Sequence, residues 1–234
     1  MTAIYQREMR SYLTSAVGYV FLAVFYAIAG YYFFATSLVS NSTDLSYVFS
    51  NLFSIVIFLV PMLTMRLFSE ERRQKTEQAL FTAPVSFTGV VMGKFLACLT
   101  MYLLGMGVTL LYFLVMCAFQ IPDVAVFCGN FLGLFLLGAA LCAIGIFISS
   151  LTESQVIPAV GSLAIGLFLL FANSFTPVVS SEWINAVMDG ISFYQHYLDF
   201  TRGLLNLSDL TFFVSVTALF LFLTVRHLER RRIS

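Results

Sequence analysis

One short stretch carries residue types that bind nucleotide phosphates. Residues 89–95, GVVMGKF, place a lysine directly after the second of two glycines, and phosphate-binding loops use this combination because backbone N–H groups and an ammonium group cradle the phosphates. However, three residues separate the glycines instead of four, and Phe95 stands where Ser or Thr must bind magnesium. We therefore reject a nucleotide site here. We expect this glycine pair, like Gly129 and Gly133, to permit close packing of helices.

Two other sets of residues could carry chemistry. His196 and Asp199 form an H-x-x-D pair, which could serve a metal or a proton transfer, but with no further ligand or nucleophile we interpret it as a polar pair on the outer surface. The cysteines show no CxxC or Cys/His spacing, which indicates free thiols and no metal site. Cys117 and Cys128 flank a short turn and could approach each other. We predict no catalytic residue in this chain and no enzyme activity of its own.

The charged residues concentrate in one segment. Residues 66–94 hold five of the twelve Lys/Arg and three of the twelve Asp/Glu, and long apolar runs flank the segment on both sides. A charged loop between apolar runs is suited to docking another protein. An ordinary solvated loop is the alternative.

This loop is predicted to be a helix, a break and a second helix. Ser69 can cap a helix that begins at Glu70, and the pairs Glu71–Lys75 and Arg73–Glu77 have the spacing of i,i+4 ion pairs. The residue before Pro84 is forced out of the helical region, so the first helix should end there. Ser86 can then cap the next helix.

The composition is that of a membrane protein. The chain has 234 residues, of which 60% are hydrophobic and only 10% charged, with a mean hydropathy of +0.93, whereas soluble domains carry about 25% charged residues. The core of a soluble protein of this length cannot bury so many apolar side chains. We predict an all-α, polytopic membrane protein. The formal net charge is zero, so nothing indicates nucleic acid as a partner.

Six transmembrane helices are predicted, because about 20 apolar residues span a bilayer. The spans are expected near residues 16–38, 47–68, 94–119, 126–150, 155–175 and 210–225, the last starting as early as 208. Pro61 should kink the second span. Before the first span, residues 1–14 form an apolar stripe beside Arg7 and Arg10, which predicts a helix at the membrane interface. A solvated N-terminus is the alternative.

The basic residues set the orientation. With six spans and a cytoplasmic N-terminus, eleven of the twelve Lys/Arg lie on the cytoplasmic side and only Arg202 lies outside. Both termini are therefore predicted to be cytoplasmic. Residues 181–206, before the last span, show two amphipathic patterns, which predict two short external or re-entrant helices.

The segment 61–97, PMLTMRLFSEERRQKTEQALFTAPVSFTGVVMGKFLA, is similar to the second-to-third-span segment of permease subunits of type-2 ABC exporters. The basic tail after the last span also resembles these proteins, and in particular the gliding-motility and copper-maturation branch of six-span permeases. The resemblance covers essentially the whole chain. It implies that residues 69–85 are a coupling helix that docks on a separate ABC ATP-binding subunit. The residues assigned to docking are Glu70, Glu71, Arg72, Arg73, Lys75, Glu77, Leu80, Thr82, Pro84 and Val85.

The resemblance further implies how the protein works. The permease has no cofactor of its own, and ATP and magnesium bind in the partner subunit. A second permease copy, or a homologous permease, completes the translocation path in the inner membrane of a bacterium. The alternatives are an ATPase-independent channel or secondary carrier, a non-transporting membrane anchor for an ATPase, and a membrane enzyme. Carriers and channels usually need charged groups near the middle of the membrane. No ionisable residue lies near the centre of a predicted span. Nothing in the sequence names the substrate.

Overall fold

The computed structural model describes residues 1–39, 44–75, 86–119, 122–171 and 190–233. Within these ranges every regular element is a helix. The helices are α1 (Thr2–Thr14), α2 (Ala16–Tyr32), the π-helix η1 (Phe33–Leu38), α3 (Ser46–Thr64), α4 (Ser69–Arg73), α6 (Phe87–Phe119), α7 (Val124–Leu151), α8 (Val156–Phe171), α10 (Phe193–Thr201) and α11 (Leu207–Ile233). The prediction of an all-helical polytopic membrane protein is confirmed.

Five of the helical segments are long and apolar enough to cross a membrane. They are Ala16–Leu38, Ser46–Arg73, Phe87–Phe119, Val124–Leu151 and Leu207–Arg231. The predicted fifth span, residues 155–175, corresponds to α8, which is apolar but has 16 residues in the described part of the chain.

Two helices extend beyond the apolar runs that mark their spans. The helix of the third span starts at Phe87, directly after the predicted cap Ser86, and runs for 33 residues, whereas its apolar run was expected from residue 94. The last helix has 27 residues, whereas its apolar run has 16. In both cases the helix continues past the apolar run into polar sequence, which hydropathy alone does not detect.

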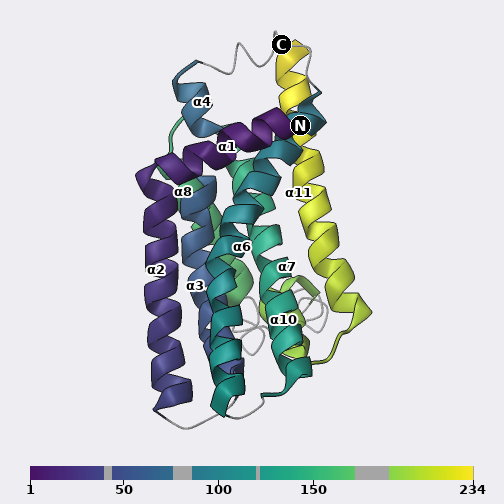
Figure 1. Cartoon of the computed structure of the whole chain (residues 1–234). Coiled ribbons are helices and arrows are strands. Elements are labelled where there is room, and N and C mark those ends of the chain that lie inside the picture. Colours follow the sequence, from purple (N-terminus) through teal and green to yellow (C-terminus); the bar gives the residue numbers. More distant parts are fainter. Residues whose placement is uncertain (40–43, 76–85, 120–121, 172–189, 234) are drawn as a thin grey trace.

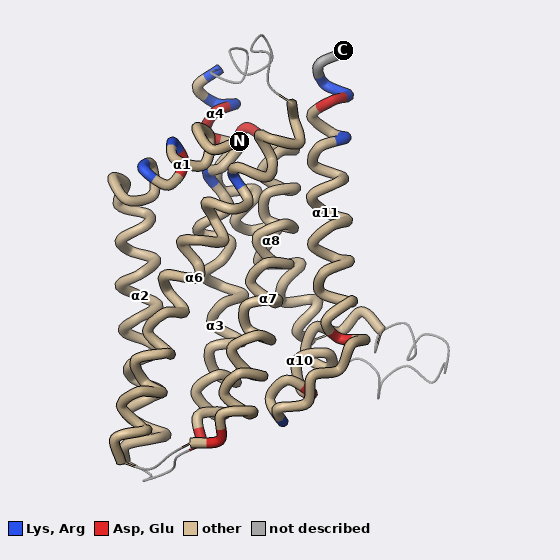
Figure 2. Tube along the Cα trace, turned by 45° about the vertical axis from the view of Figure 1, so that its right-hand side comes forward, with Lys and Arg blue, Asp and Glu red and all other residues tan. Residues whose placement is uncertain are grey.

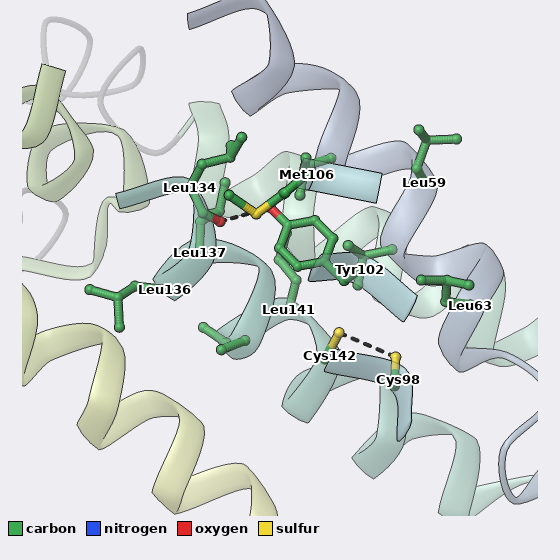
Figure 3. Packing of buried hydrophobic residues seen from close by; sticks show 14 of the residues in the cluster. Leu59, Leu63, Cys98, Tyr102, Met106, Leu134, Leu136, Leu137, Leu141 and Cys142 are labelled. Atoms are coloured by element: carbon green, nitrogen blue, oxygen red, sulfur yellow. Dashed lines mark hydrogen bonds between the residues drawn. The ribbon is translucent and has the colours of Figure 1, made fainter. Parts of the chain in front are cut away.

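The long helices run side by side, and α7 lies among them (Figure 1). It contacts α11, α3, α10, α8 and α6, and most of its residues are buried. Glycines on α7 make this close packing possible. At Gly138 a β-carbon would lie 2.1 Å from the ring of Tyr102 on α6, and the Tyr102 hydroxyl donates a hydrogen bond to the Leu134 carbonyl at 2.7 Å (Figure 3). The neighbouring helices therefore pack closely around α7.

The N-terminal helix α1 lies across one end of the bundle (Figure 1). The Tyr5 hydroxyl donates to Thr100 Oγ1 at 3.2 Å, and the Tyr12 hydroxyl donates to the Leu63 carbonyl at 2.8 Å. These bonds join α1 to α6 and α3. The predicted helix is present over residues 2–14, and its position at the membrane interface remains a prediction.

The opposite end of the bundle carries α10. This helix covers part of the second amphipathic pattern expected within residues 181–206, but it ends at Thr201. Leu204 and Leu205 lie beyond its end and are exposed. Gly203, at φ +73°, accounts for the stop because left-handed backbone favours glycine. The other pattern falls mostly on residues 181–189, outside the described residues.

Candidate docking site and its buried ion cluster

Helix α4 is anchored on α7 at its first turn. The Ser149 hydroxyl oxygen on α7 accepts hydrogen bonds from the backbone N–H groups of Phe68 and Ser69, each at 3.2 Å. The Ser69 hydroxyl donates to the Met65 carbonyl. Ser69 is therefore not the N-cap that the sequence predicted, and Ser149, 80 residues away in the chain, supplies the capping oxygen.

The far end of α4 also differs from the prediction. The described helix ends at Arg73, and Lys75 takes a left-handed backbone conformation at φ 59°. The expected Glu71–Lys75 pair was wrong because Lys75 lies beyond the last helical turn. Glu71 pairs with Arg7 of α1 and with Lys94 of α6.

Lys94 is the centre of the site. Its side chain is 0% exposed, and its Nζ donates to the Leu67 carbonyl at 2.6 Å. Nζ also lies 3.0 Å from Glu8 Oε1 and 3.0 Å from Glu71 Oε2. The ring of Phe68 is beneath it, with its centroid 4.9 Å from Nζ. A buried ammonium requires such partners, so three helices converge on one charge.

Arg7 completes the ion cluster, which comprises Arg7, Glu8, Glu71 and Lys94. Its guanidinium binds Glu8 at 2.6 Å and also binds Glu71. Burial by itself would raise the pKa of Glu8, but the charge of Lys94 and the hydrogen bond from Arg7 lower it overall. Glu8 therefore stays ionised at neutral pH, which the pairing requires.

Sequence reasoning missed this cluster, although it assigned Glu71 to the site. The available signal was a lysine within the helix that follows the loop, among residues that are otherwise apolar. Such a lysine is almost never fully buried unless it is paired, so carboxylates nearby in space could have been expected. Their identity could not be derived, because Glu8 lies 86 residues from Lys94 in the chain.

Two further arginines hold the segment in place. The Arg72 guanidinium donates to the Leu151 carbonyl at 2.9 Å and lies 3.2 Å from Glu153, both at the end of α7. Arg66 forms a bidentate pair with Glu70, at 2.8 and 3.0 Å. Arg72 therefore makes its contacts with Leu151 and Glu153 of the same chain.

The other side of α4 is open. Arg73, Gln74 and Lys75 are exposed. A cavity of about 420 Å³ lies between α1 and the α3–α4 segment, lined by both hydrocarbon and charged groups that include Arg7 and Glu70. Five residues assigned to docking lie outside the described residues: Glu77, Leu80, Thr82, Pro84 and Val85.

Lysine and arginine gather at this end of the molecule. Figure 2 shows them around α1, α4, the start of α6 and the end of α11, while acidic residues predominate at the opposite end of the long helices, where Arg202 follows α10. This separation is the distribution on which the predicted topology depends.

The start of α6 agrees with two predictions. Ser86 caps the helix, since its Oγ accepts from the Gly89 N–H at 3.3 Å. The stretch 89–95 is continuous helix and therefore lacks the loop that wraps phosphates. Gly93 lets α1 approach closely, because a β-carbon there would lie 3.1 Å from Ile4.

Gly129 and Gly133 of α7 provide the same close approach at the opposite end. A β-carbon on Gly129 would lie 2.6 Å from the Phe200 carbonyl oxygen, and one on Gly133 would lie 2.8 Å from the Phe200 side chain. The predicted close helix packing at these glycines is confirmed.

The predicted pairing of His196 with Asp199 was wrong. His196 pairs with Asp209 of α11, Nδ1 to Oδ1, at 2.6 Å, and stacks on Phe212. The predicted partner Asp199 instead accepts from Asn206 at 3.4 Å. The sequence spacing favoured the partner on the same helix over the one brought near by the fold.

All four cysteines are free: Cys98, Cys117, Cys128 and Cys142. The two whose sulfur atoms meet, at 3.3 Å in the buried core, are Cys98 and Cys142 (Figure 3). The sequence had singled out the other pair, which is exposed. In the described part of the chain, no group of three or more His, Cys, Asp or Glu could hold a metal ion.

Comparison with known proteins identifies the family. No curated protein matches the chain. The family model described as ABC-2 family transporter protein matches residues 9–173, which is more than half of the chain. The match begins in α1 and extends through α4 and α7, so it includes the ion cluster except Arg7 and Glu8. The chain therefore belongs to the ABC-2 transporter family, as a membrane permease.

Proposed function

We propose that this protein is the permease subunit of an ATP-driven export complex, and that a separate ATP-binding subunit docks on residues 69–85. The observation that carries the proposal is the two-sided character of α4. One side is fixed to the bundle by Arg72, Glu71 and Ser149, while Arg73 and Lys75 are exposed at the basic end of the molecule.

This arrangement can transmit force. A push on the exposed side of α4 acts on α6 through Glu71 and Lys94, on α1 through Glu71 and Arg7, and on α7 through Arg72. The contacts of Arg7 with Glu71 and of Arg72 with Leu151 are charge-assisted hydrogen bonds, which are stronger than neutral ones and orient both partners. Motion of the docked subunit would therefore reach three helices at once.

The rest of the proposal concerns the whole complex. Six spans, with α8 as the fifth, place both termini in the cytoplasm. Two permeases form the translocation path, and the partner subunit binds ATP and magnesium. The host membrane is the inner membrane of a bacterium. Support for this orientation comes from the gathering of basic side chains at one end.

Charge reversal at Arg73 tests the docking. In Arg73→Glu we expect most of the ATP-binding subunit to be lost when the tagged permease is purified from cells that express both, since opposed like charges across an interface cost several kcal/mol. Arg73 is the appropriate probe, because Arg72→Glu would also break the contacts with Leu151 and Glu153.

The matched control is Arg202→Glu, an exposed arginine at the opposite end of the bundle. It should retain the ATP-binding subunit. Equal recovery of the subunit with Arg73→Glu and with the unchanged protein would count against docking at this face.

A further inference from the structure

A second polar pocket lies at the opposite end of the bundle, where α3, α7 and α10 meet. Its volume is about 280 Å³. The oxygen-bearing side chains in its lining include Asp44 before α3, Asp123 before α7, Asn130 on α7 and Thr201 at the end of α10. Among the described residues that line it there is no Lys, Arg or His.

The two carboxylates accept backbone N–H groups at the starts of α7 and α3. Asp123 Oδ1 accepts from the N–H groups of Ala125 and Val126 at 2.9 and 3.4 Å. Asp44 Oδ1 accepts from the Ser46 N–H at 2.8 Å. Asp123 is the N-cap of α7, whereas Asp44 precedes Leu45, the N-cap of α3. These hydrogen bonds account for both aspartates and by themselves need no ligand.

The hydrogen bonds of Asn130 leave one of its polar atoms without a partner. Its side chain is 0% exposed, and its Nδ2 donates to the carbonyls of Val126 at 2.9 Å and Thr201 at 3.4 Å. These two acceptors fix which way the amide points. Its Oδ1 is then buried with no hydrogen-bond partner among the described residues. A buried amide oxygen left unsatisfied is costly. Because Asn130 lines the pocket, an ion bound there could supply the missing partner.

We propose that this pocket binds one hard divalent cation, Ca²⁺, at the end of the bundle that lies outside in the proposed topology. Carboxylate and amide oxygens are the ligands that Ca²⁺ uses, and it accepts irregular sites completed by water, whereas Mg²⁺ demands near-octahedral geometry. The volume leaves room for those waters. With only two carboxylates the affinity should be that of weak extracellular calcium sites, with Kd about 10⁻⁴ to 10⁻³ M.

The bound ion would join elements that are far apart in the chain. Asp44 belongs to the connection into α3, and Asp123 to the start of α7. Asn130 ties the pocket to the last carbonyl of α10. Calcium would therefore fix the outer ends of three helices relative to one another, at the end opposite to the docking site.

Equilibrium dialysis of the purified full-length chain against radioactive Ca²⁺ tests the proposal. We expect saturable binding of a single ion by the unchanged protein. Asp123→Asn should weaken the apparent affinity about tenfold or more, because calcium sites are tuned by the number of charged ligands. Asparagine also caps helices well, so this change removes charge and keeps the N–H acceptor. The control Asp199→Asn alters an acidic residue at the same end that does not line the pocket, and it should bind as the unchanged protein does.

Absence of saturable binding by the unchanged protein would overturn the proposal, and so would undiminished binding by Asp123→Asn. Should Asp123→Asn fail to fold, Asp44→Asn gives the same test with the same two outcomes, since its side chain can also accept from the Ser46 N–H. The measurement uses the permease alone, so its result does not depend on whether an ATP-binding subunit docks at the other end.

Discussion

Replacing Lys94 with methionine is expected to destabilise the protein by about 3 to 5 kcal/mol, the usual cost of removing one partner from a buried ion pair. Methionine can fill the space of the aliphatic stem, so packing is largely kept. What is lost is the positive charge that Glu8 and Glu71 share, each 3.0 Å from Nζ. Arg7 alone would then have to neutralise both carboxylates. Denaturant unfolding of the purified chain in detergent micelles measures the effect.

Two comparisons isolate the cause. Lys75→Met removes an exposed lysine next to the same site, and exposed substitutions usually stay within about 0.5 kcal/mol. Adding Glu8→Gln and Glu71→Gln to Lys94→Met should recover part of the loss, because the carboxylates left without a counter-charge are removed. If Lys94→Met unfolds at the same denaturant concentration as the unchanged protein, the buried cluster does not hold α1, α4 and α6 together.

Alanine at Gly138 should strongly destabilise the protein. Its β-carbon would lie 2.1 Å from Cε1 and 2.3 Å from Cζ of Tyr102. Tyr102 is 0% exposed, and its hydroxyl donates a hydrogen bond to the Leu134 carbonyl. The ring therefore cannot move away from an added β-carbon without breaking that hydrogen bond. Overpacking a core costs about 1 to 3 kcal/mol, occasionally more, and we expect the upper end of this range in denaturant unfolding.

The control is Gly107→Ala on α6, where an added β-carbon meets nothing within 4 Å. There alanine should leave stability unchanged or raise it by up to about 1 kcal/mol, since alanine favours helix over glycine. Tyr102→Leu combined with Gly138→Ala should be less destabilised than the sum of the two single changes. Additive losses, or a Gly138→Ala variant as stable as Gly107→Ala, would show that the helices do not approach as described.

The sequence predicted most of the fold because membrane helices follow from local composition. Every expected span has a corresponding apolar helix, and Ser86 caps α6 as its position before a helix suggested. The apolar runs are shorter than the helices where polar residues continue a helix, as in α6, which starts at Phe87 although its apolar run was expected from residue 94. Hydropathy identifies the residues that cross the hydrocarbon layer. It does not identify the helical turns that extend beyond that layer.

The candidate site was predictable only in outline. The charged segment and its position between two spans follow from the sequence. The partners of its residues do not, because local spacing suggested Lys75 for Glu71, while the fold brings Lys94 and Arg7 to it. The same reason explains Ser149 in place of Ser69 as the capping oxygen, and Asp209 in place of Asp199 beside His196. Long-range pairs depend on helix packing, which a single sequence does not specify.

The central claim is that the exposed side of α4 meets an ATP-binding subunit. A photo-crosslinking benzoylphenylalanine placed at the exposed Gln74 tests it in intact cells, with the same residue at Leu207, 74% exposed at the other end of the bundle, as control. We predict an adduct from position 74 whose peptides include a phosphate-binding G-x-x-x-x-G-K-[ST] loop, and none from position 207. No such adduct at position 74, or an equal yield from both positions, would contradict the account.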